Sequence, residues 1–248
     1  MFHAILYQPL FNLLIWLYNV LPGADLGFAI IGISIVVKLA MWPLSHASLK
    51  SQKALQELQP KLETLKVQYK DDKEGLAKAM MQLYQAEKVN PLSSCLPLLI
   101  QIPILFALYA VLQDGLNAER LVNLYPFVHN PGSVNPYFLG FIDLGQPHLV
   151  MAVIAGILQF FQTKMLMARR PPAAVRKELG AKDEDMMAAM NKSMLYVMPV
   201  MTVVIGASLP GGLTLYWIVM NLLSIVQQFL AFRSIKPASP VSLPVAKE

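Results

Sequence analysis

Long apolar runs alternate with polar segments along most of the chain. Four runs approach the roughly 20 residues that a helix needs to cross a bilayer: 26–43, 94–113, 148–167 and 194–232. The turn signal "SLPGGL" at 208–213 interrupts the last run and divides it into two helices, 194–209 and 213–232. The pattern therefore predicts an all-α polytopic membrane protein with five transmembrane helices, which together form a core over residues 25–233.

The polar segment 50–90 has a helical pattern of its own. Leu55, Leu58, Leu62 and Leu65 recur at alternating spacings of three and four, which places them in one apolar seam. The sequence "YKDDKEG" interrupts this helix, and a second amphipathic stretch follows until the "NP" at 90–91 ends it. We expect a helical hairpin, with these four leucines and Tyr84 as candidate contacts for a partner. The alternative is a solvated loop with helical propensity.

The first apolar stretch, residues 2–21, allows two interpretations. It is long enough for a sixth span or an uncleaved signal, but Pro9 interrupts it and no basic segment precedes it. Gln8, Asn12 and Asn19 lie within a narrow arc of the helical wheel. This pattern favours an amphipathic interfacial helix on the outer face, covering residues 1–24.

Basic residues set the orientation of the predicted spans. Segments 49–90 and 164–192 and the tail from residue 233 hold eighteen of the twenty Lys and Arg residues, whereas the loop 114–147 holds one. By the positive-inside rule the N-terminus lies outside and the C-terminus in the cytoplasm, which makes 50–90 a cytoplasmic hairpin. The charged segment 169–192 has no packing pattern and is predicted to be mobile. The Pro/Ser-rich residues 234–248 are predicted to be a disordered cytoplasmic tail.

Composition excludes several kinds of chemistry. The chain is 56% hydrophobic and only 14% charged, which is typical of a multi-pass membrane protein. Its single cysteine, Cys95, excludes an intramolecular disulfide and argues against a metal cluster. Glycine-rich phosphate loops, zinc-protease motifs and nucleophile elbows are lacking. We therefore expect no enzyme activity, cofactor, metal or small-molecule substrate.

One charge interrupts the first apolar run. A lysine at bilayer depth costs about 3 kcal/mol on insertion scales, and Lys38 lies about 18 Å below the outer boundary by the helical rise. Ser34 shares its stripe, Gln101 lies in the second span, and Trp217 and Asn221 lie in the fifth. Most polar positions fall in the cytoplasmic half. The pattern predicts a cavity that is open to the cytoplasm and closed toward the outside.

Each of these positions also has a simpler interpretation. Lys38 could extend its ammonium to the inner headgroups, and Trp217 could be ordinary packing. Polar side chains between helices often form only an interhelical hydrogen bond, worth about 0.6 kcal/mol. However, Asp and Glu are absent from all five predicted spans. Lys38 therefore needs water or a visiting anion to compensate its charge.

Two long segments carry a family resemblance. They are "LQPKLETLKVQYKDDKEGLAKAMMQLYQAEKVNPLSSCLPLLIQIPILFALY" at 58–109 and "LPGGLTLYWIVMNLLSIVQQ" at 209–228. Through them the chain, over about residues 8–233, resembles a short bacterial-type member of the YidC/Oxa membrane protein insertase family. The resemblance implies a five-helix core around a hydrophilic groove. It also implies that Lys38 stands where the family usually has arginine, Ser34 at a small hydroxyl position, and Trp217 at an aromatic substrate contact.

The expected function is therefore that of an insertase and chaperone in the bacterial plasma membrane. Its expected partners are newly made membrane proteins, the Sec translocon, membrane lipids and, more weakly because the tail lacks a basic block, the ribosome. Two alternatives remain open at this stage. One is a small transporter or channel with Lys38 as an anion site, and the other is a passive scaffold for assembling membrane complexes.

Overall fold

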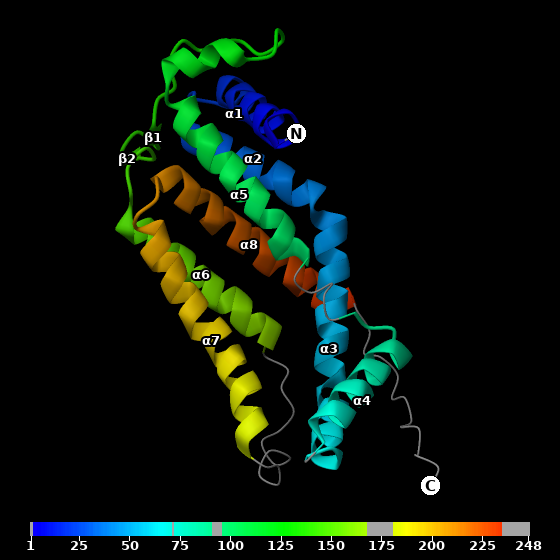
Figure 1. The fold of residues 1–248 in the computed structure, drawn as a ribbon. Coiled ribbons are helices and arrows are strands. Elements are labelled where there is room, and N and C mark those ends of the chain that lie inside the picture. The colour runs from blue at the N-terminus through cyan, green and yellow to red at the C-terminus, as the bar shows by residue number, and fades with distance from the viewer. Residues whose placement is uncertain (1, 71, 91–95, 168–180, 235–248) are drawn as a thin grey trace.

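The computed structural model describes residues 2–70, 72–90, 96–167 and 181–234, and it is mostly helical (Figure 1). A short π-helical turn, His3–Tyr7, precedes the first α-helix. The α-helices are α1 (Gln8–Val20), α2 (Leu26–Ala40), α3 (Trp42–Gln68), α4 (Lys73–Ala86), α5 (Leu96–Gly115), α6 (Leu149–Met167), α7 (Ala181–Gly206) and α8 (Gly211–Ser234). The segment 116–148 between α5 and α6, named the outer loop because it is predicted to lie outside, adds a 3-10 helix, Ala118–Asn123, and two short antiparallel strands, β1 (Tyr137–Phe138) and β2 (Ile142–Asp143). The prediction of a helical membrane protein is confirmed, apart from this small β-hairpin.

Two helices are long and apolar enough to cross a membrane by themselves. These helices are α6, whose apolar part is Leu149–Leu166, and α8, whose apolar part is Gly211–Phe232. A third span results if α2 and the first part of α3, which meet at a bend of 62°, are counted as one. The apolar segments Leu99–Gly115 and Leu195–Gly206 are shorter. The structure thus gives two or three candidate spans among the described residues, and the five-span arrangement remains a prediction.

Because of the bend after α2, the helical hairpin predicted for residues 50–90 begins earlier in the chain. The predicted first span, 26–43, ends as a helix at Ala40, and α3 begins at Trp42. Pro43 lies in the first turn of α3, where the missing N–H needs no partner and the fixed φ suits the helix. The first hairpin helix therefore begins inside the predicted span rather than at residue 50.

Part of the charged segment before the fourth predicted span is helical. Of the segment 169–192 that is predicted to be mobile, residues 181–192 form the first part of α7. Their sequence, "AKDEDMMAAMNK", is rich in Ala, Met, Glu and Lys, which favour helix, and its early acidic residues suit the positive end of the helix dipole. Residues 168–180, the predicted tail 235–248 and Cys95 lie outside the described residues.

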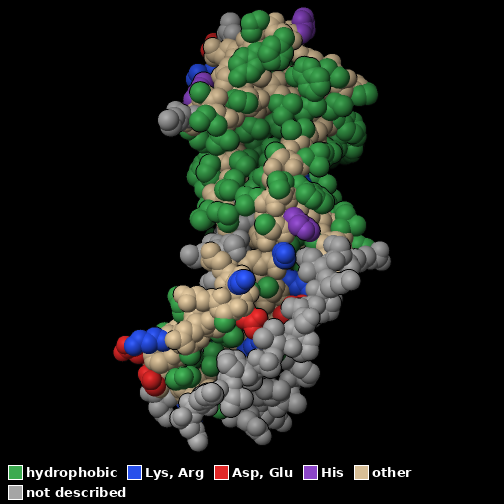
Figure 2. Space-filling model, turned by 90° about the vertical axis from the view of Figure 1, so that its right-hand side faces the viewer, with side chains coloured by type: hydrophobic (Ala, Val, Ile, Leu, Met, Phe, Trp, Pro, Cys, Tyr) green, Lys and Arg blue, Asp and Glu red, His purple; other side chains and the backbone are tan. Residues whose placement is uncertain are grey.

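Helix α8 lies at the centre of the membrane domain. It packs against α2 on one side and α6 on the other, with a smaller contact to α5, while α7 packs on α6 (Figure 1). The largest fully buried side chains of the core gather toward the outer end: Phe11, Ile15, Ile30, Ile33, Leu108, Leu213 and Tyr216. On the face shown in Figure 2, hydrophobic side chains cover the upper body and most charged side chains lie below, where α3 and α4 project.

Helix α1 and the outer loop cover the outer end. The polar face predicted for α1 contacts this loop: Asn12 Oδ1 accepts a hydrogen bond from the Tyr125 N–H at 2.6 Å, and Asn19 Nδ2 donates to the His129 carbonyl at 2.6 Å. Tyr7 adds a bond from its hydroxyl to Asp114 at 2.6 Å, and burial together with this carboxylate raises the pKa of Tyr7. Together with the π-helical turn, α1 forms one continuous helix over residues 2–20, so its length does not decide between a span and an interfacial helix, and the interfacial helix stays a prediction.

Candidate functional site

Lys38 lies on the side of α2 that faces α8. Its side chain is buried, with 7% of its surface exposed, and its ammonium donates a hydrogen bond to Ser224 Oγ at 2.8 Å. The Ser224 hydroxyl in turn donates to the Met220 carbonyl at 2.7 Å. In the described part of the chain no carboxylate lies within ion-pairing distance of Lys38. The protein therefore holds a buried positive charge between two helices with one hydroxyl as its partner.

Ser34 lies one turn before Lys38 on the same helix. It is completely buried, and its hydroxyl donates to the Ile30 carbonyl at 2.6 Å. The hydroxyl is thus satisfied within α2, as is common for serine in a membrane helix. Ser34 shares the stripe that the sequence predicted, and contact with a client stays a prediction.

Gln101 joins α5 to α8. Its side-chain amide donates to the Tyr216 hydroxyl at 2.6 Å, and Tyr216 is 1% exposed. The neighbouring Trp217 is half-buried and packs against the hydrophobic core. The sequence indicated Gln101 and Trp217 but did not indicate Tyr216. The sequence signal that could have indicated Tyr216 was its position beside Trp217 in "LTLYW", because a tyrosine buried between helices needs a hydrogen-bond partner for its hydroxyl.

Asn221 faces a different neighbour. Its amide donates to the Ala155 carbonyl of α6 at 3.2 Å. A second polar contact, between Thr202 of α7 and Gln159 of α6, joins the next pair of helices. The structure therefore brings Lys38 together with Ser224, and Gln101 with Tyr216, while Asn221 lies in the contact between α8 and α6.

Polar side chains continue along α8 below Ser224. Gln227 and Gln228 are 2% and 3% exposed. Within the described residues, neither the Gln227 amide nitrogen Nε2 nor the Gln228 oxygen Oε1 has a hydrogen-bond partner. A buried amide without a partner costs about 1–3 kcal/mol, so such atoms favour contact with water or a polar ligand. They extend the polar character of α8 toward its C-terminal end.

The leucine seam packs inside the hairpin. Leu58 and Leu62 are 5% and 2% exposed, whereas Leu55 and Leu65 are half-buried. Lys61 of α3 also forms an ion pair with Glu87, just beyond α4. The two buried leucines therefore stabilise the hairpin. Contact between this seam and a partner stays a prediction.

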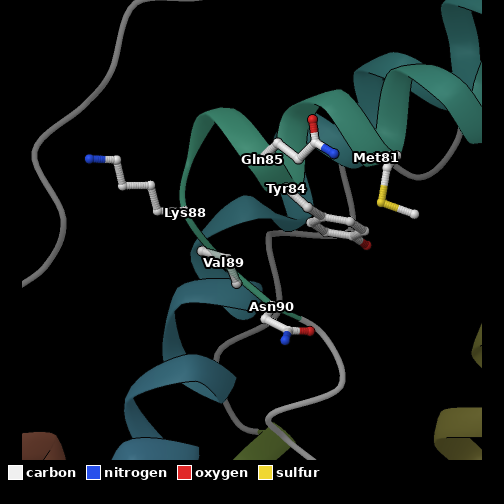
Figure 3. Close-up of a pocket in the computed structure, with 6 residues that line it drawn as sticks. All are labelled: Met81, Tyr84, Gln85, Lys88, Val89 and Asn90. Carbon is white, nitrogen blue, oxygen red and sulfur yellow. The ribbon is translucent and has the colours of Figure 1, made fainter.

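Tyr84 lines a small cavity at the end of α4. The cavity has a volume of about 270 Å³ and is lined by Met81, Tyr84, Gln85, Lys88, Val89 and Asn90. Figure 3 shows the Tyr84 ring beside the Met81 thioether, while the Lys88 ammonium points away from both. Burial raises the pKa of Tyr84. Tyr84, one of the predicted hairpin contacts, therefore lines a largely apolar hollow.

The described residues contain no group of three or more His, Cys, Asp or Glu side chains that could hold a metal ion. Polar groups instead gather as pairs between helices. Such pairs can bind water, anions or polypeptide, because they offer a cation, hydroxyls and amides.

Comparison with known proteins gives consistent matches. A family model described as "60Kd inner membrane protein" matches residues 16–238. A Geobacter sulfurreducens protein is 35% identical over 95% of this chain and 38% of its own length. A Nitrosococcus oceani protein is 33% identical over 94% of this chain and 37% of its own length. A protein from Francisella tularensis subsp. novicida is 34% identical over 90% of this chain and 35% of its own length. All three are named "Membrane protein insertase YidC", and the chain spans little more than a third of their length.

Proposed function

Because the chain belongs to the 60Kd inner membrane protein family, the family of the YidC/Oxa insertases, we propose that it inserts and folds other membrane proteins in the bacterial inner membrane. Five spans cross the bilayer in this proposal: α2, α5, α6, the apolar end of α7, and α8. The N-terminus lies outside and the C-terminus in the cytoplasm, in keeping with the eighteen basic residues on one side.

The observation that carries the proposal is Lys38. A buried ammonium with a single hydroxyl partner and no nearby carboxylate among the described residues is poorly compensated. An acidic or strongly polar segment of a client would compensate it at lower cost than lipid could. We therefore assign Lys38 to the reception of hydrophilic client segments in a groove open to the cytoplasm.

The surrounding polar side chains replace part of the client's hydration. Ser34 and Ser224 offer hydroxyls near Lys38, and Gln101 offers an amide between α5 and α8. Trp217 contacts the client's apolar part, and Asn221 supports the groove from its α6 side. In this proposal the groove reaches into the inner leaflet, which shortens the apolar barrier left for the client's outer segment.

Insertion then proceeds without covalent chemistry. The client's hydrophobic segment moves from the protein into lipid, and its burial, worth about 25 cal/mol per Å² of apolar surface, supplies the driving force. Newly made membrane proteins are the clients, received from ribosomes at the α3–α4 hairpin and shared in part with the Sec translocon. The half-buried Tyr84 is the proposed contact at the hairpin.

Reconstitution tests this function. The purified chain is placed in protein-free liposomes, and a small single-span client with an acidic outer tail is synthesised in their presence. We expect protease protection of the client tail to rise well above that in empty liposomes. If protection matches that of empty liposomes while the protein remains folded, the insertase assignment is wrong.

Cysteine labelling tests the orientation separately. In a variant with Cys95 replaced by Ser, a cysteine at Lys70 should react with an impermeant maleimide only from the cytoplasmic side. A cysteine at Ser133 in the outer loop should react only from the opposite side. Labelling of both positions from one side would contradict the five-span arrangement.

A further inference from the structure

The β-hairpin of the outer loop presents apolar side chains at its tip. Its turn places Leu139 and Gly140 at φ values of 53° and 80°, so the chain reverses tightly between β1 and β2. Leu139 is 53% exposed and Phe141 is 73% exposed. Left in water, these two side chains forgo the favourable free energy of burying their apolar surface. A tight turn of this kind usually carries polar residues, so the apolar tip calls for a partner.

This hairpin is attached firmly to the outer end of α2. Asp25 caps α2 by accepting a hydrogen bond from the Gly27 N–H at 2.7 Å, and its other oxygen accepts one from the Leu139 N–H at 2.7 Å. The Phe138 ring lies directly on Gly27, since a Cβ added there would be 2.0 Å from ring atom Cδ2. The position of the tip relative to α2 is therefore fixed by both a hydrogen bond and close packing.

The tip continues an apolar surface of α2. Phe28, Ile35 and Leu39 are 41%, 41% and 61% exposed, and they lie within about 40° of one another at 100° per residue. Phe28 also contacts the Phe138 ring edge-to-face, with centroids 5.6 Å apart. A stripe of exposed apolar residues on a membrane helix faces lipid, and the hairpin lies where this stripe begins.

We propose that Leu139 and Phe141 insert into the outer leaflet of the bilayer and anchor the outer end of α2. The partner is the boundary between the headgroups and the acyl chains, where interfacial segments bury Phe and Leu side chains. Continuity with the lipid-facing stripe of α2 supports lipid as this partner. Since Lys38 lies on the same helix about 18 Å from its start, the anchor also sets the depth of that charge. The inference requires only that α2 spans the membrane, and it is independent of the insertase function.

Nitroxide accessibility tests the anchor in proteoliposomes. In the full chain with Cys95→Ser, a spin label is attached to a single cysteine in the variants Phe141→Cys and Leu139→Cys. Phe28→Cys is the control for a lipid-facing position, and Ser133→Cys, at an exposed turn of the same loop, is the control for water. Collision rates are measured with oxygen, which concentrates in lipid, and with a water-soluble nickel chelate.

Labels at 141 and 139 should resemble the label at 28, with the ratio of oxygen to nickel collisions reversed relative to position 133. If they instead show the nickel accessibility of position 133, the tip lies in water and the anchor is wrong. If they are shielded from both reagents, another protein or a second copy of the chain covers the tip, which also overturns the proposal. Using two tip positions keeps the result independent of disruption by either substitution.

Discussion

The outer end of the molecule and the α3–α4 hairpin are held together in opposite ways. At the outer end, hydrogen bonds join segments more than a hundred residues apart, as between Asn12 and Tyr125 or Tyr18 and Asn135. The N–H groups of Gly211 and Gly212, at the start of α8, donate to the carbonyls of Gln146 and Leu144 at 2.8 and 2.9 Å. The outer loop thus ties α1, α2 and α8 into one unit.

The hairpin depends on contacts between neighbours in sequence. Leu58 and Leu62 pack within it, and Lys61 pairs with Glu87 across it. Its first helix, α3, follows α2 through the bend and also contacts α5 and α8. Because different contacts hold the two regions, we expect the outer end to stay folded when the hairpin unfolds.

The largest effect is expected inside the hairpin. Replacing both Leu58 and Leu62 by Asp places carboxylates in buried positions and should destabilise the hairpin by at least about 3 kcal/mol. Hydrogen exchange should rise throughout α3 and α4 but remain unchanged in α1 and α8. Val67→Asp is the control, because Val67 is 51% exposed and should tolerate the charge. Equal loss of protection in α8 would contradict the separation of the two regions.

A smaller effect is expected at the contact between α2 and the outer loop. Gly27→Ala forces the Phe138 ring to move, and we expect a net loss of about 2 kcal/mol despite the gain in helix propensity. The thermal midpoint in detergent should fall. Gly115→Ala is the matched control, since its new Cβ would meet Leu14 at an ordinary 3.7 Å. Equal midpoints for the two variants would show that the loop is not seated as described.

The smallest effect is expected at the polar face of α1. Asn12→Ala leaves the Tyr125 N–H without its acceptor, and we expect a loss of about 1 kcal/mol. Asn19→Ala removes a similar bond at an exposed position, where water can replace it, and should change the midpoint far less. Equal shifts for the two variants would mean that burial does not strengthen this contact.

Much of the helical pattern was predictable because lipid demands long apolar runs. The predicted span 148–167 corresponds to α6, Leu149–Met167, and the turn at 208–213 separates α7 from α8. The helical start of α7 and the β-hairpin were not predicted. Local periodicity does not report contacts between distant segments, and the β-hairpin depends on Asp25, more than a hundred residues away from Leu139.

The site was predictable in part. Their helical-wheel positions, and the absence of acidic residues from the predicted spans, identified Lys38 and Gln101 as polar positions between helices. Their partners, Ser224 and Tyr216, depend on which helices are neighbours, and a single sequence does not specify this. For the same reason the contact of Asn221 with α6 was not predicted, and its role in a groove stays a prediction.

The most direct test of the account concerns the charge of Lys38. Insertion of one client, with its tail carboxylates intact or neutralised, is measured in liposomes containing the wild type, Lys38→Arg, Lys38→Ala or Lys38→Glu. Since the charge attracts acidic segments, Arg should retain insertion, Ala should lose it for the acidic tail, and Glu should be worse still, while the neutral tail should be affected far less. Equal loss for both tails in every variant would contradict the account and leave Lys38 a structural residue.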